Sequence, residues 1–256
     1  MKIVVLKFGG TSVGTIERIK KVAKLIINYK KKNYRVIVVS SAMSGVTNDL
    51  IKKANSISSN FSKTEYDVLV SSGEQMSCAL IAGALTNLGY KSKSFLGWQI
   101  PIITDANHCD ARIENISTKE IKKFINSGGI PIVAGFQGMT KERRISTLGR
   151  GASDYSAIMI AKFFKASKCI IYTDVSGIMT TDPKVYRNAK KIRIISYEEM
   201  LEMSSLGSKV MQSNSVQDAR LNRIDVNVMS SFTNEKGTLV TKRKKILNKK
   251  IITGIS

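Results

Sequence analysis

A lysine followed by two glycines stands near the start of the chain, in the string Lys7 to Gly14 (KFGGTSVG). Lys7 belongs to an apolar run that predicts a β-strand, and a helical pattern begins soon after the glycines. Glycines let backbone N–H groups approach phosphate oxygens, and a helix N-terminus adds a favourable dipole. Because the lysine precedes the glycines, this is not a Walker loop. The string predicts a phosphate-binding loop without specifying the phosphate compound.

Two further strings could bind a charged small molecule. Glu74 lies among small residues at the head of an apolar helical stretch, where its carboxylate could face the helix dipole or receive an ammonium group. Arg150, in the string 147–157 (TLGRGASDYSA), could hold a carboxylate by two parallel hydrogen bonds. Ser153 or Asp154 in the same string could equally cap a helix. Residue types alone leave both interpretations of each string open.

The string Tyr172 to Lys184 (YTDVSGIMTTDPK) follows a predicted strand. Hydroxyl and acidic groups at a strand end, here Thr173 and Asp174, commonly engage a nucleotide or its metal when a phosphate loop is adjacent. The Asp-Pro pair at 182–183 by itself predicts only a turn. His108 lies in a polar loop without an evident partner, so we interpret it as a surface residue with no catalytic or metal-binding role.

Composition argues against several classes of protein. The net charge is +22, from 41 Lys+Arg and 19 Asp+Glu, but the basic residues are dispersed without an RNA-binding aromatic motif or zinc finger. We therefore expect no specific nucleic-acid partner. No apolar run approaches the roughly 20 residues of a membrane helix, and no signal peptide is evident, so a cytoplasmic protein without a membrane partner is expected. Cys78, Cys109 and Cys169 are scattered, which predicts buried free thiols and no metal site.

Short β-rich segments alternate with helical ones, which predicts an α/β fold whose mainly parallel sheet has helices on both faces. Expected strands are 3–8, 35–42, 92–96, 130–136, 169–175, 225–232 and 237–241; expected helices are 16–31, 65–88, 118–126, 153–165, 197–204 and 209–223. Glycines gather at the strand ends. Open α/β sheets bind ligands at that edge, so the candidate residues should meet there.

The ordered set of strings resembles the catalytic domain of the aspartokinases, in the amino acid kinase family. The matching strings cover about residues 1 to 240 and are KFGGTSVG, VVSSAMSGVTND, SSGEQMS, TLGRGASDYSA, YTDVSGIMTTDPK, LGSKVMQ and GTLV. SSGEQ together with LGRG-SD favours the aspartokinases over relatives that act on acetylglutamate, glutamate or UMP. The resemblance implies an open, mainly parallel eight-stranded sheet sandwiched between helices.

The resemblance also implies an activity. Aspartokinases transfer the γ-phosphoryl group of ATP, with Mg²⁺, to the β-carboxylate of L-aspartate. The product, 4-phospho-L-aspartate, begins the biosynthesis of lysine, threonine, methionine and diaminopimelate. Other possibilities are a UMP or glutamate-type kinase, a catalytically impaired truncated aspartokinase, or a protein without catalytic activity. An ionised carboxylate needs no general base, which agrees with motifs rich in Lys, Arg and Gly that lack a catalytic histidine.

Residue roles follow from the same resemblance. Lys7 would neutralise charge on the transferring phosphoryl group, and Asp154 would hold Lys7 in place. Glu74 would bind the substrate ammonium group and Arg150 its α-carboxylate. The remaining substrate residues would be Ser41, Thr47, Gly151 and Ser153. The nucleotide would contact Phe8, Gly9, Gly10, Thr173, Asp174, Met179, Thr180, Thr181, Asp182, Pro183, Lys184 and Lys209, together with Lys7.

Several positions depart from the family pattern. Met179 stands where tyrosine is usual, Lys184 where arginine is usual, and Ala152 replaces a glycine. The largest departure is the ending: residues 1–241 would form the catalytic domain, and 242–256 a basic tail that starts a truncated ACT-type regulatory region. We therefore expect no intrinsic feedback by lysine or threonine. A homodimer is possible, weakened by the absence of ACT domains.

Overall fold

The computed structural model of the chain describes residues 2–149, 151–208, 210–242 and 254. The strands are β1 (Ile3–Phe8), β2 (Arg35–Ser40), β3 (Ser92–Phe95), β4 (Ile102–Thr104), β5 (Ile113–Ile116), β6 (Ile130–Ala134), β7 (Gln137–Met139), β8 (Ile145–Thr147), β9 (Lys168–Thr173), β10 (Ile194–Ser196), β11 (Val226–Ser230) and β12 (Thr238–Thr241). The helices are η1 (Gly10–Val13, a 3₁₀ turn), α1 (Ile16–Lys31), α2 (Val46–Ile57), α3 (Lys63–Asn87), α4 (Lys119–Asn126), α5 (Ala152–Phe163), α6 (Tyr197–Ser205) and α7 (Ser213–Asn222).

The main sheet has eight strands in the order β10-β12-β11-β9-β1-β2-β6-β3. The number of strands agrees with the eight-stranded sheet that the family resemblance implied, whereas the strand order was not predicted. All neighbouring pairs are parallel except β11 with β12. β1 lies between β2 and β9, and Lys7 is in register with Val39 on one side and Ile171 on the other. Lys7 and the glycines after it therefore emerge at the carboxyl edge of the sheet, between two neighbouring strand ends.

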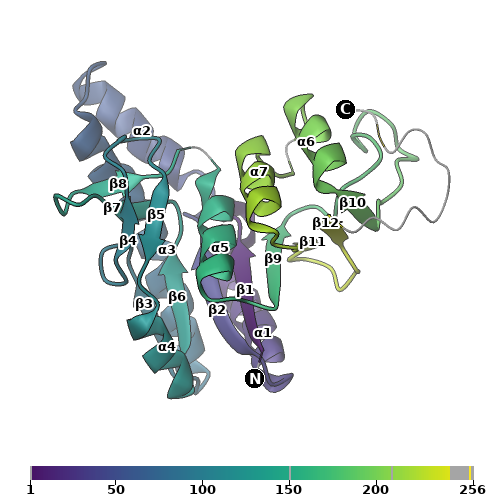
Figure 1. The fold of residues 1–256 in the computed structure, drawn as a ribbon, viewed down its shortest axis with the longest axis horizontal. Helices are drawn as coiled ribbons and strands as arrows, with labels where there is room; N and C mark the ends of the chain where they lie inside the picture. The colour runs from purple at the N-terminus through teal and green to yellow at the C-terminus, as the bar shows by residue number, and fades with distance from the viewer. Residues whose placement is uncertain (1, 150, 209, 243–253, 255–256) are drawn as a thin grey trace.

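Helices cover both faces of this sheet (Figure 1). One apolar cluster joins α1 and α3 to Val4, Leu6 and Phe8 of β1. The other joins α4, α5 and α7 to Val5 and its neighbours. Side chains alternate between the faces along a strand, so Lys7 shares the α5 face with Val5. That alternation directs the lysine towards the start of α5.

A second sheet of four short strands, in the order β5-β4-β7-β8, was not predicted from the sequence. Nor was α2, which lies together with β7 and β8 at the upper left of Figure 1. β8 packs against α3, the helix that carries Glu74. This second sheet therefore supplies an additional wall beside the carboxyl edge of the main sheet.

Every expected strand and helix has a counterpart, with ends shifted by a few residues. The expected helix 209–223 begins on a residue outside the described part and is observed as α7. The proposed domain division after residue 241 stays a prediction, because residues 243–253 and 255–256 are outside the described part.

α3 is 25 residues long and, by length and composition alone, is apolar enough to cross a membrane. The expectation that no apolar run reaches this length is wrong by that criterion, because Val, Leu, Ile and Ala keep the mean hydropathy of the helix high although Ser and Gly interrupt the run. Half of the most apolar window is buried, and α3 packs against α1, α2, β3 and β6. A core helix of a soluble protein passes the same test, so α3 is only weak evidence for a membrane span.

Candidate active site

Lys7 and Asp154 form a buried ion pair. Lys7 lies near the carboxyl end of β1, and Asp154 lies in the first turn of α5. Lys7 Nζ is 2.6 Å from Asp154 Oδ1, in a contact that lacks hydrogen-bond alignment, and the residues are 9% and 6% exposed. Their proximity follows from the strand alternation that turns Lys7 towards α5. A carboxylate at this distance fixes the lysine charge at the carboxyl edge of the sheet.

The two glycines after Lys7 pass close to neighbouring backbone. The Gly9 N–H donates to the carbonyl of Tyr172 at 3.1 Å, which anchors the turn to the end of β9. A Cβ on Gly10 would lie 2.8 Å from the carbonyl oxygen of Ala42, so only glycine fits there without a shift. The first backbone N–H groups of η1, which begins at Gly10, have no partner within the turn itself. Such a turn beside a buried lysine suits a phosphate group.

Glu74 is a buried carboxylate with one oxygen satisfied. Its Oε1 accepts a hydrogen bond from the Ala42 N–H at 3.0 Å, whereas its Oε2 has no hydrogen-bond partner among the described residues. The residue is only 4% exposed. Burial raises the pKa of Glu74 from 4.5 to about 7, although the Ala42 N–H and the charge of Lys7 oppose the rise. A buried acceptor of this kind is suited to a cationic ligand group.

A cavity of about 620 Å³ lies over Glu74. It brings together five residues predicted to bind the substrate, which are Ser41, Thr47, Glu74, Gly151 and Ser153. Gly135, at the end of β6, permits the approach of Ser153, because a Cβ there would lie 3.0 Å from the Ser153 Cβ. The cavity is large enough for an amino acid, and its walls come from α2, α3 and the segment before α5.

The position of Ser41 depends on two serines that sequence analysis missed. The Ser77 hydroxyl donates to the Ser41 carbonyl at 2.7 Å and pairs with the Ser40 hydroxyl at 2.9 Å. Ser77 lies one turn after Glu74 on α3 and is fully buried. The sequence signal that could have identified Ser77 is its type and spacing, a small polar residue three positions after Glu74. Its partners at the end of β2 become evident only in the fold.

The residues predicted to bind the nucleotide form a separate region after β9. The Thr173 hydroxyl donates to the Asp174 carboxylate at 3.0 Å. Further along the chain, the backbone of Met179 forms an isolated antiparallel β-bridge with Lys191. The Asp182 carboxylate accepts a hydrogen bond from the Lys184 N–H at 2.8 Å. The segment Met179–Lys184, including Thr180, Thr181 and Pro183, does not line the 620 Å³ cavity.

Two predicted residues, Arg150 and Lys209, lie outside the described residues. Both neighbours of Arg150 in the chain, Gly149 and Gly151, line the 620 Å³ cavity and have positive φ angles of 80° and 73°. The backbone on each side of Arg150 is therefore in the left-handed region that favours glycine.

The interpretation of His108 as a surface residue is wrong. Its side chain is 14% exposed, and Nδ1 lies 2.6 Å from Asp67 Oδ2. The partner lies 41 residues earlier, on α3, which is why no local pattern revealed it. Cys109 is also a correction, because it is half-buried, whereas Cys78 and Cys169 are buried free thiols as expected. Burial and, next, the Asp67 charge raise the pKa of Cys109 to about 11.

Within the described residues, no group of three or more His, Cys, Asp or Glu side chains is arranged to hold a metal ion. Mg²⁺ in phosphoryl-transfer sites is commonly held by one or two carboxylates together with substrate phosphates. Asp174, exposed at the end of β9 near the glycine turn, is a carboxylate suited to that arrangement.

Comparison with known proteins places the chain in a family. The model of the amino acid kinase family matches residues 2–230. This chain belongs to the amino acid kinase family. The aspartokinase of Rickettsia felis is 48% identical over 260 residues, covering 100% of this chain and 65% of that relative. The chain thus spans just under two thirds of the length of that amino acid kinase.

Solved structures of two kinases share the fold of this chain. E. coli aspartokinase III in complex with aspartate and ADP has a TM-score of 0.85 and 29% identity, over 95% of this chain and 65% of that one. A UMP kinase from Bacillus anthracis has a TM-score of 0.71 and 17% identity, over 95% and 97% of the two chains. At that identity the likeness to the UMP kinase shows the fold alone.

Proposed function

We propose that this chain is an aspartate kinase, which transfers the γ-phosphoryl group of ATP to the β-carboxylate of L-aspartate. The observation that carries the proposal is Glu74, which lines an amino-acid-sized cavity and whose buried Oε2 has no hydrogen-bond partner among the described residues. The similarity to aspartokinases over the whole chain supports the same substrate. The product would be 4-phospho-L-aspartate.

A zwitterionic substrate requires an anion and a cation in one pocket. Ionised Glu74 supplies the anion for the ammonium group, and its own burial strengthens the interaction. We propose that Arg150 supplies the cation for the α-carboxylate, since its chain neighbours Gly149 and Gly151 line the same cavity. A nucleotide such as UMP has no ammonium group, so the buried Glu74 charge disfavours it.

The transfer itself needs charge neutralisation and alignment. The β-carboxylate of aspartate is already ionised and attacks phosphorus without a general base. Lys7, held by Asp154 at 2.6 Å, stabilises the negative charge on the transferring group. The Gly9–Gly10 turn offers backbone N–H groups to the phosphates, and its close approach to Ala42 leaves no space for a side chain.

We propose that ATP extends from this turn towards Thr173, Asp174 and the segment Met179–Lys184, with Lys209 as a further contact. Mg²⁺ would supply charge neutralisation between the phosphates, held by them and by Asp174. The reaction would open the route to lysine, threonine, methionine and diaminopimelate in the cytoplasm.

The test is to trap the product with hydroxylamine. The purified chain is incubated with Mg-ATP and either L-aspartate, L-glutamate or UMP, and the hydroxamate is measured by its ferric complex. We expect hydroxamate with L-aspartate alone, and a loss of about 10²-fold or more in the Lys7→Ala variant. Hydroxamate formed with L-glutamate, or ADP released with UMP, would show that this compound and not L-aspartate is the substrate. Equal activity in Lys7→Ala would refute the role of the lysine.

A further inference from the structure

A second buried carboxylate, Asp67, lies on the same face of α3 as Glu74. The two residues are seven positions apart, which is about two helical turns or ~10 Å along the axis. Asp67 is fully buried, but its oxygens, in contrast to Glu74 Oε2, are occupied by protein donors. One carboxylate of α3 is thus left for a ligand, and the other is engaged within the fold.

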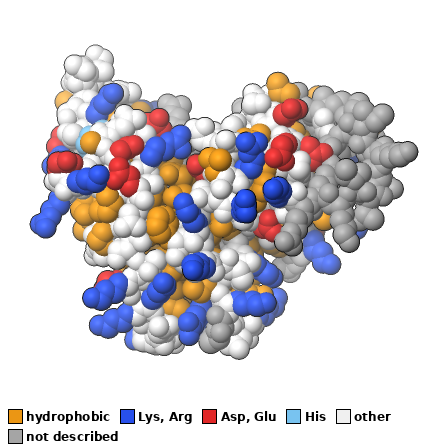
Figure 2. Space-filling model, in the orientation of Figure 1, with side chains coloured by type: hydrophobic (Ala, Val, Ile, Leu, Met, Phe, Trp, Pro, Cys, Tyr) orange, Lys and Arg blue, Asp and Glu red, His pale blue; other side chains and the backbone are white. Residues whose placement is uncertain are grey.

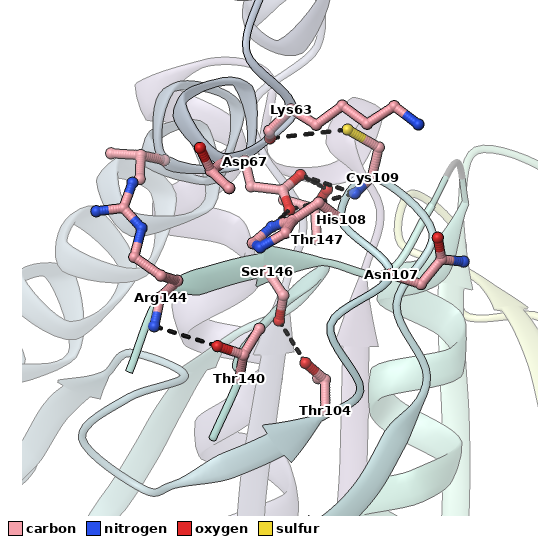
Figure 3. A network of polar contacts seen from close by, with 12 residues as sticks. Lys63, Asp67, Thr104, Asn107, His108, Cys109, Thr140, Arg144, Ser146 and Thr147 are labelled. Carbon is pink, nitrogen blue, oxygen red and sulfur yellow. Dashed lines mark hydrogen bonds and ion pairs between the residues drawn. The ribbon is translucent and has the colours of Figure 1, made fainter. Parts of the chain in front are cut away.

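Asp67 holds three residues from two separate segments (Figure 3). Its Oδ1 accepts from the Thr147 hydroxyl at 2.5 Å and from the Cys109 N–H at 3.1 Å. Its Oδ2 lies 2.6 Å from His108 Nδ1. A carboxylate can only accept hydrogen bonds, so Nδ1 carries the proton in this contact. Asp67 therefore joins α3 to β8 and to the loop between β4 and β5.

The loop conformation depends on this anchoring. Cys109 has a φ of 70°, in the left-handed region that non-glycine residues rarely adopt. The N–H of that strained residue is one of the groups that Asp67 accepts from. Two residues later, the Ala111 N–H donates to the Thr147 carbonyl at 2.9 Å, which ties the loop to β8 a second time. Loss of the Asp67 charge would weaken the charge-assisted hydrogen bonds that offset the strain.

The anchored residues form part of the cavity wall. Cys109 and Thr147 both line the 620 Å³ cavity that contains Glu74. The next residue of the loop, Asp110, packs against Gly149, where a Cβ would lie 2.6 Å from its Oδ1. The loop is thus in contact with the segment that continues through Arg150 to Ser153. A shift of the loop would move the part of the cavity wall that Cys109 and Thr147 form.

We infer that Asp67 is a positioning residue for the amino-acid pocket, acting through His108, Cys109 and Thr147. The inference rests on the proposed function for the identity of the substrate. Within the described residues, no comparable set of hydrogen bonds connects Asp67 to the Gly9–Gly10 turn or to Thr173. Its loss therefore weakens binding of the amino acid more than binding of the nucleotide.

The experiment compares Asp67→Asn with the parent chain in two measurements. The asparagine side chain keeps the size of the aspartate but replaces one acceptor oxygen by a donor. We expect the KM for L-aspartate to rise about 10-fold or more while the KM for ATP stays within about twofold. Glu65→Gln is the matched control, because Glu65 lies two residues away on α3 and pairs with Arg144 at the surface. Its KM values should equal those of the parent.

The second measurement is independent of activity. Alkylation of Cys109 by iodoacetamide at pH 8, followed by peptide mass spectrometry, should be about fivefold or more faster in Asp67→Asn, because the Asp67 charge disfavours the Cys109 thiolate. Unchanged alkylation would refute the anchoring. Equal rises in both KM values would refute the positioning role.

The two proposals can fail separately. A parent chain that forms no hydroxamate with L-aspartate contradicts the proposed function, whereas the alkylation rate still decides whether Asp67 anchors the wall. If Asp67→Asn does not fold, Thr147→Val removes a single donor with little change of shape. We then expect a KM for L-aspartate raised about threefold with the KM for ATP unchanged, and an unchanged KM for L-aspartate would overturn the inference.

Discussion

Glu74 carries a cost for the folded protein because its pKa is raised from 4.5 to about 7 by burial. Below pH 4.5 the carboxyl is protonated in both the folded and unfolded states. As the pH rises from 4.5 towards 7, the unfolded chain loses this proton first, so the folded state loses relative stability. Above pH 7 the cost levels off at about 3 kcal/mol, from about 1.4 kcal/mol for each pKa unit.

This residue-scale argument predicts the behaviour of Glu74→Gln. We expect its free energy of unfolding to exceed that of the parent by about 1–3 kcal/mol at about pH 8, and by much less at about pH 5. The same variant should lose L-aspartate turnover, because a neutral amide cannot pair with the ammonium group. Urea titrations at the two pH values measure the difference. A variant that is less stable than the parent at the higher pH would contradict the burial of an ionised Glu74.

At the scale of elements, the turn between β1 and η1 depends on its close packing against the segment after β2. A Cβ at Gly10 would lie 2.8 Å from the Ala42 carbonyl, whereas a Cβ at Gly83 on α3 meets no heavy atom of the described residues within 4 Å. Gly10→Ala must therefore displace backbone, and Gly83→Ala need not.

We expect Gly10→Ala to raise the KM for ATP about 10-fold or more, because the phosphate-facing N–H groups move with the turn. Gly83→Ala, the control, should leave the KM unchanged and add about 0.5–1 kcal/mol to the free energy of unfolding, since alanine favours a helix interior. Steady-state kinetics and urea titration measure the two effects. Similar KM values for ATP in both variants would show that the turn does not contribute to the nucleotide site.

The elements that sequence analysis found are those with long, periodic apolar patterns, such as β1, β2 and α1. β4, β7 and β8 are three residues each, too short for an alternation to be recognised. α2 did carry a signal, since Val46, Leu50 and Ala54 recur every four residues, but the polar residues between them obscured it. The second sheet was therefore missed as a unit.

The candidate site divides in the same way. Lys7, Glu74 and Ser153 belong to strings whose residue types suggest chemistry, and the fold brings them to one edge. Asp67 and His108 carry no local signal, because their contact joins residues 41 positions apart and the strands of the unpredicted sheet hold the loop. Long-range polar contacts need the topology before they can be inferred.

At the scale of the whole molecule, the charge of +22 is spread over the surface. Figure 2 shows Lys and Arg side chains scattered over the visible face, with acidic side chains between some of them. An excess of one sign destabilises the compact state by self-repulsion, and salt screens it over a Debye length of about 10 Å at 0.1 M.

The Tm of the chain should therefore rise as NaCl increases from about 20 to 300 mM, because screening relieves this repulsion. Differential scanning fluorimetry in a buffer of constant pH measures the shift. A control titration with glucose at matched osmolality should leave a smaller change. A Tm that falls with NaCl would mean that attractive surface ion pairs, such as the one between Arg144 and Glu65, outweigh the net repulsion.

The central position of β1 also bears on how the chain folds during synthesis. β1 is complete by residue 8, but its neighbour β9 begins only at Lys168, and Asp154 lies in α5, the helix directly before β9. Most of the chain must therefore be synthesised before both edges of β1, the first strand to leave the ribosome, are paired. Non-local pairing of this kind slows folding and leaves an apolar edge exposed in the nascent chain. The strand that carries Lys7 is therefore the earliest made, yet its second edge stays unpaired until β9 has been synthesised.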